Sequence, residues 1–356
     1  MQFVQGFREI FEGVKYDTIA CDIYGVLHDG LEAYPYSKDA LTELKLRDEQ
    51  VILLSNSTRL QDKLDAAMSV KFGITTQHYS ELLSSGLLTK YFLKDLSEYL
   101  KTGKVEKAAC HATVRFKGKE QRMDPEEFAA TYLKQGKFFL AGDPDWQEPL
   151  YMPCAPTLER VHDWDQMEFV LLGSIRGLFP ETKPVNPFSA EDVRADYKPL
   201  LDKCLEKNIP MICANPDVFA PNGVDENGNI RLLICPGFVG QMYEEMGGQV
   251  LYFGKPFRSI YEYLIEHKAR KPLIEEAEKI GNGTFPKRIV CVGDNIATDV
   301  KGATELGLDV VLILGGVHWE ELKGYKDEED LKTRVKQLCK KHNSKEPTYL
   351  MPLLRY

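Results

Sequence analysis

Short apolar runs that end in small or polar residues constrain the fold of this chain more than any other feature. Five such runs are each followed by Asp, Ser or Gly: Thr18–Cys21, Val51–Leu54, Val250–Phe253, Ile289–Val292 and Val310–Leu314. Helical patterns follow most of them, for example Ser37–Leu46, Leu60–Lys71 and Ser259–His267. Continuous apolar strands that alternate with helices are typical of a parallel sheet covered on both faces. The sequence therefore predicts a doubly wound α/β fold, in which ligands bind at the carboxyl ends of the strands.

The length of the chain, 356 residues, suits two domains rather than one. A long insertion interrupts the first pattern and carries strand-like runs and a helix of its own: Phe138–Leu140, Phe169–Leu172, Met211–Cys213 and Tyr197–Lys207. We expect a discontinuous core domain of residues 1–86 and 236–356, with an inserted α/β domain at residues 87–235. Within the insertion, the charged segment His111–Lys134 has no clear pattern and is predicted to be a surface excursion.

Both ends of the chain are predicted to pack on the core domain. Met1–Lys15 has apolar residues at helical spacing and predicts a short helix, with a docking helix for a partner as the alternative. Glu328–Lys341 predicts a charged helix, and the apolar end Pro347–Tyr356 should pack on the core.

Charge and composition exclude several classes of partner. The net charge of −9 disfavours nucleic acid and anionic membranes. No apolar run approaches the roughly 20 residues that a membrane span requires, and the first residues make a poor secretory signal. These features predict a cytoplasmic location. The eight cysteines form no CxxC pair, so we expect reduced, buried thiols and no zinc or redox motif.

Polar residues follow the first two strands. Asp22 comes directly after a buried run and precedes a loop with Gly25 and Gly30, whose backbone N–H groups could point at an anion. Ser55-Asn56-Ser57 follows the second run, and a hydroxyl and an amide there could bind phosphate. The plainer interpretations are an Asp that caps its loop and a Ser that caps the next helix.

Two more fragments follow later strands. Gly254-Lys255-Pro256 holds a lysine at a strand end, although a lone lysine is more often surface charge. Gly293-Asp294 is followed by Asp299, so that two carboxylates span a strand-to-helix turn. Such a pair suits Mg²⁺, which prefers few carboxylates and keeps several waters.

In this order, the four fragments resemble the motifs of the haloacid dehalogenase superfamily. The resemblance covers roughly residues 15 to 318, and the insertion lies where the family's type-2 cap domains lie. Ser84-Ser85-Gly86 and Ala214-Asn215-Pro216-Asp217 are similar to the NagD-like subclass, class IIA. The resemblance implies a Rossmannoid core with an inserted α/β cap, and Mg²⁺ as the cofactor.

The resemblance also implies a role for each residue. Asp22 would attack phosphorus and form an aspartyl-phosphate, Ser55 would hold the phosphoryl group, and Lys255 would neutralise both. Mg²⁺ would be bound by Asp22, Asp294 and the backbone carbonyl of Tyr24, with Asp299 behind them. The predicted substrate-binding residues are Gly25, Asn56, Ser57, Asn215 and Asp217.

The chain departs from the family pattern at Tyr24. The family's phosphatases have a second Asp there, which protonates the leaving group and later activates water. A phenol with an ordinary pKa near 10 is poorly matched to that task at neutral pH. The substrate could instead have a good leaving group, His28 or Asp29 could serve, or the site could bind phosphate without turnover.

Two functions therefore stay open. The first is a Mg²⁺-dependent phosphatase acting on a small phosphorylated metabolite, with pairing of two copies through the cap as in related proteins. The second is a catalytically impaired protein that serves as a binding or structural subunit in a larger assembly. Dehalogenation would not require a metal, and the pair Asp294 and Asp299 argues against it.

Overall fold

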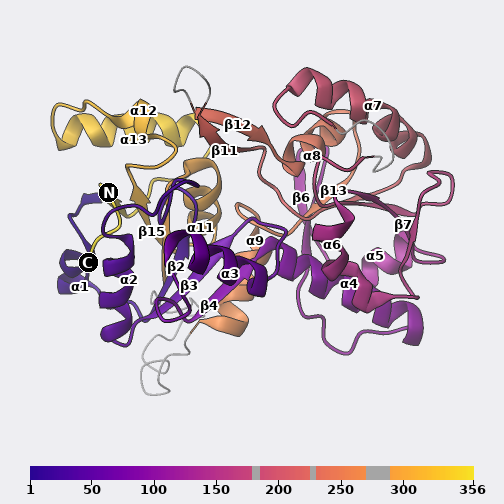
Figure 1. Cartoon of the computed structure of the whole chain (residues 1–356), viewed down its shortest axis with the longest axis horizontal. Coiled ribbons are helices and arrows are strands. Elements are labelled where there is room, and N and C mark those ends of the chain that lie inside the picture. The colour runs from indigo at the N-terminus through magenta and orange to yellow at the C-terminus, as the bar shows by residue number, and fades with distance from the viewer. Residues whose placement is uncertain (179–184, 225–229, 270–288) are drawn as a thin grey trace. The chain divides into compact units, whose positions relative to one another are not determined.

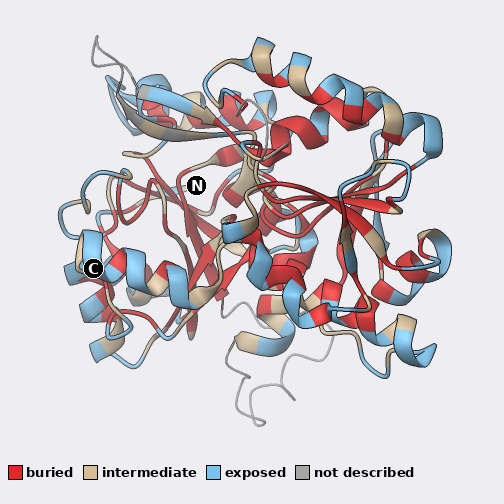
Figure 2. Cartoon of the chain, turned by 45° about the vertical axis from the view of Figure 1, so that its right-hand side comes forward, coloured by how far each residue is buried: buried red, intermediate tan, exposed pale blue. Residues whose placement is uncertain are grey.

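A computed structural model describes residues 1–178, 185–224, 230–269 and 289–356 of the chain. The chain divides into two compact units (Figure 1). The first comprises Met1–Ser55, Asp62–Leu83 and Tyr261–Tyr356, and the second comprises Asn56–Gln61 and Ser84–Ile260. Each unit is built on a sheet of its own, and in each the central strands are buried while many helices expose one face (Figure 2).

The sheet of the first unit has seven strands in the order β1-β16-β15-β14-β2-β3-β4. The strands are β1 (Gln2–Phe3), β2 (Thr18–Asp22), β3 (Gln50–Ser55), β4 (Glu81–Ser84), β14 (Ile289–Gly293), β15 (Asp309–Ile313) and β16 (Tyr349–Met351). All five pairings from β1 to β3 in this order are parallel. The predicted parallel sheet is confirmed, and the carboxyl ends of β14, β2 and β3 lie side by side at one edge.

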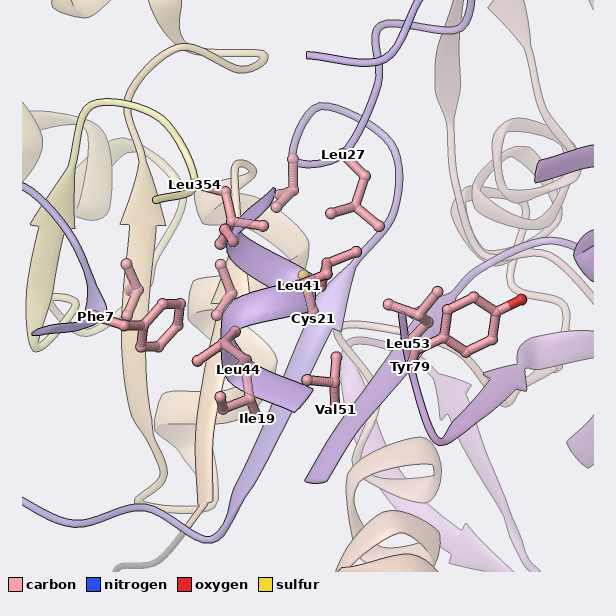
Figure 3. Packing of buried hydrophobic residues seen from close by; sticks show 14 of the residues in the cluster. Phe7, Ile19, Cys21, Leu27, Leu41, Leu44, Val51, Leu53, Tyr79 and Leu354 are labelled. Atoms are coloured by element: carbon pink, nitrogen blue, oxygen red, sulfur yellow. The ribbon is translucent and has the colours of Figure 1, made fainter. Parts of the chain in front are cut away.

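The first unit also contains helices, which are α1 (Phe7–Gly13), α2 (Ser37–Leu46), α3 (Gln61–Phe72), α9 (Arg258–Tyr263), the π-helices η2 (Leu264–Lys268) and η3 (Ile296–Val300), α11 (Lys301–Glu305), α12 (Trp319–Leu322) and α13 (Glu328–Lys341). Of these, α9 begins in the second unit and ends in the first. In α2, Leu41 and Leu44 lie on one face because helical residues three and four apart are neighbours. They belong to the same buried cluster as Ile19 and Val51 of the sheet (Figure 3).

The sheet of the second unit also has seven strands, in the order β6-β5-β13-β10-β9-β7-β8. They are β5 (Ala112–Phe116), β6 (Lys119–Met123), β7 (Lys137–Ala141), β8 (Glu159–Val161), β9 (Phe169–Leu172), β10 (Met211–Cys213) and β13 (Val250–Tyr252). The pairings from β13 to β8 are parallel, whereas β5 pairs antiparallel with both β13 and β6. A separate antiparallel hairpin joins β11 (Phe219–Val224) to β12 (Ile230–Ile234).

The helices of the second unit have clear start and stop signals. They are α4 (Ser85–Thr102), α5 (Pro125–Tyr132), α6 (Pro144–Tyr151), the 3₁₀ helix η1 (Met152–Cys154), α7 (Ala190–Lys207) and α8 (Pro236–Glu245). The Ser84 hydroxyl accepts a hydrogen bond from Leu87 N at the start of α4, and Gly103 ends it with φ of 74°. Ser189 caps α7 in the same way, through Asp192 N.

The strand predicted at Val250–Phe253 forms, but it belongs to the other sheet. As β13 it pairs with β10 and β5 of the second unit, so this unit extends to Ile260 rather than ending at residue 235. The sequence-based domain bounds of 87 and 235 differ accordingly from the two compact units. An apolar run predicts a buried strand, but it carries no information about which sheet contains that strand.

The segment His111–Lys134 is not a surface excursion, and that prediction was wrong. It forms β5, β6 and α5, and β5 is a paired strand of the second sheet. Four of the five residues of β6 are exposed at the sheet edge. Charged side chains on such an edge strand hide its pattern in the sequence and discourage pairing with other chains.

Both ends of the chain pack on the first unit, as the sequence predicts. Phe7 and Ile10 of α1 are buried, and β1 pairs with β16 near the opposite terminus. Figure 1 shows both termini within this unit. The eight cysteines all lie in the described part of the chain, where they are buried and form no disulfide. Among the described residues, no helix has the length and apolar character needed to cross a membrane.

Candidate phosphate and metal site

Three carboxylates meet at the carboxyl edge of the first sheet. Asp22 ends β2, Asp294 follows β14, and Asp299 lies in η3 one turn later. The strands bring them together because β14 and β2 pair in parallel, with Val292 opposite Cys21. One oxygen from each carboxylate lies within 4.8 Å of the others. Asp294 is 4% exposed and Asp299 is 3% exposed.

Backbone from two other loops encloses the Asp294 carboxylate. The Val317 N–H donates a hydrogen bond of 2.7 Å to its Oδ2. Gly25 has φ of +79°, and a Cβ there would lie 1.9 Å from the same oxygen. A Cβ on Gly316 would lie 2.2 Å from the Cβ of Asp294. The two glycines therefore allow an approach to the carboxylate that no other residue type permits.

The donor set fits a divalent cation such as Mg²⁺. Carboxylates this close repel one another, and burying charge is costly unless it is paired. A hard cation with oxygen ligands relieves both costs. Asp22, Asp294 and Asp299 are the residues that would hold it. The carbonyl of Tyr24 stays a predicted further ligand.

The loop around Asp299 is closely packed. Its Oδ2 accepts a hydrogen bond from Asn295 N over 3.1 Å, and its backbone carbonyl accepts one from the Tyr261 hydroxyl over 3.2 Å. A Cβ on Gly293 would lie 2.2 Å from the Asp299 side chain, so only a glycine at this position leaves room for the carboxylate. Asp299 is thereby held next to Asp294 by its own turn.

Tyr24 is tied into its own loop. Its hydroxyl donates a hydrogen bond to the backbone carbonyl of Asp29, and a Cβ on Gly30 would lie 2.8 Å from that hydroxyl. Burial, with the nearby charges of Asp29 and Asp294, raises the pKa of Tyr24 to about 12. A neutral phenol whose proton is engaged by a carbonyl is a poor proton shuttle at neutral pH.

The two substitute candidates are also engaged in the loop. His28 is buried, stacks on Phe72 at 3.9 Å between ring centroids, and accepts a hydrogen bond at Nδ1 from Gly30 N. Burial lowers the pKa of His28 to about 4. The Oδ1 of Asp29 accepts two hydrogen bonds of 2.7 Å from the next turn, from Leu31 N and Glu32 N. Both side chains therefore have structural roles in this loop.

Ser55 lies where the sequence predicts it. It ends β3, one residue beyond Leu54, which pairs with Asp22. Its hydroxyl is thus on the strand next to the Asp22 strand and at the same edge. Its contact with a phosphoryl group stays a prediction.

The remaining predicted site residues lie in the second unit, where several of them meet. The Asn56 side-chain amide donates to the carbonyl of Lys255 over 2.9 Å, and its oxygen accepts from Lys255 N over 2.7 Å. The same amide donates to Asp217 Oδ1 over 2.8 Å. A Cβ on Gly254 would lie 2.3 Å from the Asn56 oxygen, so the glycine permits this contact. Asn56, Asp217 and Lys255 thus form one hydrogen-bonded group.

Asn215 and Ser57 have local roles in the second unit. The Asn215 side chain accepts a hydrogen bond of 2.9 Å from Asp217 N, which shapes the turn after β10. The Ser57 hydroxyl accepts one of 3.1 Å from Arg59 N. Recognition of a substrate by Asn215, Asp217 or Ser57 stays a prediction.

Sequence reasoning missed the segment after β15. The sequence indicates only that the run Val310–Leu314 ends at a glycine, Gly315, whereas Gly316, Val317 and His318 contact the Asp294–Asp299 loop. The available signal was the string Gly-Gly-Val-His directly after a buried run. Its meaning depends on β15 lying next to β14, which the sequence pattern does not reveal.

Two family models match segments of the chain. A family model described as haloacid dehalogenase-like hydrolase matches residues 19–111, and one described as HAD-hydrolase-like matches residues 252–338. No curated protein matches the chain significantly.

Three solved structures share the fold over nearly the full length. A haloacid dehalogenase-like hydrolase from Brucella suis 1330 is 24% identical, with a TM-score of 0.62 over 99% of this chain and 100% of that chain. A possible sugar phosphatase from Cytophaga hutchinsonii is 19% identical, with a TM-score of 0.61 over 99% and 98%. NagD from E. coli K-12 is 15% identical, with a TM-score of 0.52 over 96% and 97%. The chain belongs to the haloacid dehalogenase-like hydrolases, and its fold is NagD-like.

Proposed function

We propose that this protein is a Mg²⁺-dependent phosphatase that hydrolyses a small phosphorylated metabolite through an aspartyl-phosphate on Asp22. The observation that carries the proposal is the cluster of Asp22, Asp294 and Asp299 at the carboxyl edge of a parallel sheet. Ligands of doubly wound folds bind at this edge. A carboxylate beside a cation site is suited to attack a phosphoryl group.

Different residues of the chain would bind the metal, attack phosphorus and orient the metal ligands. When bound by Asp22, Asp294 and Asp299, Mg²⁺ supplies positive charge that lowers the repulsion between the phosphate and the attacking carboxylate. An oxygen of Asp22 forms a bond to phosphorus as the bond to the leaving oxygen breaks. A water oxygen then bonds to phosphorus as the bond from phosphorus to the Asp22 oxygen breaks, which releases inorganic phosphate and restores the Asp22 carboxylate. The Val317 amide keeps Asp294 oriented throughout.

The hydrogen bond of the Tyr24 hydroxyl restricts which phosphate esters the site could hydrolyse. Its phenolic proton is engaged by the Asp29 carbonyl, so no proton is donated from this position to the leaving group. Substrates whose leaving group departs as a stable anion, such as acyl and aryl phosphates, need no such proton. We therefore expect these to be turned over faster than alkyl phosphates.

Roles for Ser55 and Lys255 are part of the same proposal. Ser55 would donate its hydroxyl to the phosphoryl group, and Lys255 would contribute a positive charge. Lys255→Met with Lys255→Arg as the matched control tests the charge, because both keep a long side chain but only Arg keeps the cation. The proposal expects the rate to fall much further in the Met variant.

The test is hydrolysis of p-nitrophenyl phosphate and acetyl phosphate, with Mg²⁺ or with a chelator, by wild type and Asp22→Asn. Loss of the nucleophile should lower the rate by on the order of 10⁴-fold or more. Tyr24→Asp should raise the alkyl phosphatase rate, since general acid–base catalysis contributes about 10²–10⁴-fold. Wild type and Asp22→Asn that are equally inactive on every substrate would refute the phosphatase.

The alternative is a protein that binds phosphate without turnover. The engagement of Tyr24, His28 and Asp29 within their loop favours it, because none of the three is set up to move a proton. Calorimetry with inorganic phosphate and Mg²⁺ distinguishes the two. Binding that Asp294→Asn abolishes, in a protein without phosphatase activity, would support a binding or structural subunit.

A further inference from the structure

The imidazole of His318 contacts the loop that carries two of the three clustered carboxylates. Its Nε2 accepts a hydrogen bond of 3.1 Å from the backbone N–H of Ile296. Ile296 begins η3, between Asp294 and Asp299, and the first N–H groups of a helix have no partner within the helix. His318 is 6% exposed, so its imidazole takes the place of water at this amide.

Glu321 sets the tautomer of this imidazole. An Nε2 that accepts a hydrogen bond carries no proton, so the proton of the neutral ring is on Nδ1. The Nδ1 atom lies 3.1 Å from Glu321 Oε2, and it donates to that carboxylate. Burial lowers the pKa of His318, which keeps the ring neutral and Nε2 available as an acceptor. A carboxylate partner is a common means of orienting a histidine near a metal site.

The surroundings of the His318–Glu321 pair restrict its movement. Lys341, at the end of α13, lies 3.6 Å from the other oxygen of Glu321. The ring of His342 lies 5.5 Å from that of His318, between centroids, and its buried Nε2 has no hydrogen-bond partner among the described residues. The His318 imidazole is thus packed against the end of α13 on one side, and on the other it is hydrogen-bonded to the Asp294–Asp299 loop.

The segment that carries His318 also holds Asp294 itself. The preceding residue, Val317, donates its N–H to Asp294 Oδ2 over 2.7 Å. Two consecutive residues after β15 are therefore hydrogen-bonded to the loop, Val317 to the Asp294 carboxylate and His318 to the Ile296 amide. A shift of this segment would move Asp294 relative to Asp299.

We propose that His318, oriented by Glu321, is a positioning residue that sets the separation of Asp294 and Asp299 and thereby the affinity of the site for Mg²⁺. The inference rests on the metal site of the proposed function. His318 acts through the backbone of Ile296 and touches neither the substrate nor the metal.

Two variants isolate the hydrogen bond to Ile296. His318→Leu fills the buried space but cannot accept the bond, whereas the amide oxygen of His318→Gln lies near the position of Nε2 and can accept it. Glu321→Gln is the third variant, since it keeps an acceptor for Nδ1–H but removes the charge. Urea unfolding of each variant measures any general loss of stability.

The first readout is hydrogen exchange at the Ile296 amide in the metal-free protein, and the second is Mg²⁺ affinity by calorimetry. His318→Leu should lose protection at Ile296 and bind Mg²⁺ about 10–100-fold more weakly, the usual cost of losing such a supporting contact. His318→Gln should recover most of both. Glu321→Gln should give values of amide protection and Mg²⁺ affinity between those of His318→Leu and His318→Gln.

Several results would overturn the inference. One is a wild-type Mg²⁺ affinity in His318→Leu. Another is an equal loss of Mg²⁺ affinity in His318→Leu and His318→Gln, which would indicate that the imidazole contributes only by packing. Either leaves the phosphatase proposal intact. Wild type that binds no Mg²⁺ would overturn the metal site and this inference together, whereas unchanged Ile296 exchange in His318→Leu would refute the positioning role by itself.

Discussion

Replacing Gly25 by Ala tests the geometry of the carboxylate cluster most directly. Gly25 combines two constraints, a φ of +79° and a Cβ position 1.9 Å from Asp294 Oδ2. A non-glycine residue in the left-handed region costs about 1–2 kcal/mol. Ordinary contact begins near 3.4 Å, so the Asp294 oxygen would also have to move by about 1.5 Å. A metal site tolerates deviations of only about 0.2 Å in its ligand distances.

We expect Gly25→Ala to weaken Mg²⁺ binding by at least about 100-fold, since a ligand displaced by 1.5 Å no longer reaches the ion in the same geometry. We also expect a loss of about 1–2 kcal/mol in the free energy of unfolding of the metal-free protein from backbone strain. Calorimetry measures the first effect and urea unfolding the second.

Two other glycines separate these effects. Gly307 has φ of +73° but no atom within 4 Å of its Cβ position, so Gly307→Ala should lose stability and keep its Mg²⁺ affinity. Gly316 has no left-handed strain, but its Cβ would lie 2.2 Å from the Cβ of Asp294, so Gly316→Ala should lose Mg²⁺ affinity. Wild-type Mg²⁺ affinity in Gly25→Ala would refute the reasoning.

Three further predictions concern the loop after β2 and the second unit. Tyr24→Phe should leave the p-nitrophenyl phosphatase rate within about 3-fold of wild type, because the phenol moves no proton; a large drop would show that it does. His28 binds a proton more weakly when folded (pKa about 4) than when unfolded, so its stabilising contribution falls as the pH drops through 6.5 towards 4. Between pH 7 and pH 5, the free energy of unfolding of the metal-free His28→Phe protein in urea should therefore fall by up to about 2 kcal/mol less than that of wild type; the same pH dependence in both proteins would contradict this. Asn56→Ala should destabilise the protein by about 2–4 kcal/mol in urea unfolding, because it removes the partners of the buried Lys255 N–H and carbonyl; Asn56→Asp should not recover this loss, because it places a carboxylate against Asp217 and the Lys255 carbonyl.

Much of the first unit follows from local patterns in the sequence. The apolar runs of β2, β3, β14 and β15 predicted the parallel sheet, and the residues after them predicted which edge holds the site. Asp22 and Asp294 could be predicted to lie together because side chains after parallel strands share one edge. That they are neighbours required the strand order, which places β14 directly beside β2.

The second unit shows where local patterns carry no information. The run Val250–Tyr252 has the composition of a buried strand in either sheet, and only its pairing with β10 and β5 decides between them. β6 has four exposed polar residues out of five and looks like loop in the sequence. Its strand conformation comes from hydrogen bonds to β5, which are contacts with another segment rather than a property of its own residues.

The sequence by itself determined which groups are available at the site: three carboxylates, a serine, a lysine, and a tyrosine where a second loop carboxylate would be expected. Tertiary structure decided what those groups can do. The Tyr24 hydroxyl is engaged by the Asp29 carbonyl, and Asp294 and Ile296 are held by Val317 and His318 from a different strand. Residue type sets the chemistry of a side chain, but hydrogen-bond partners and burial set its orientation and protonation, and both depend on segments far apart in the chain.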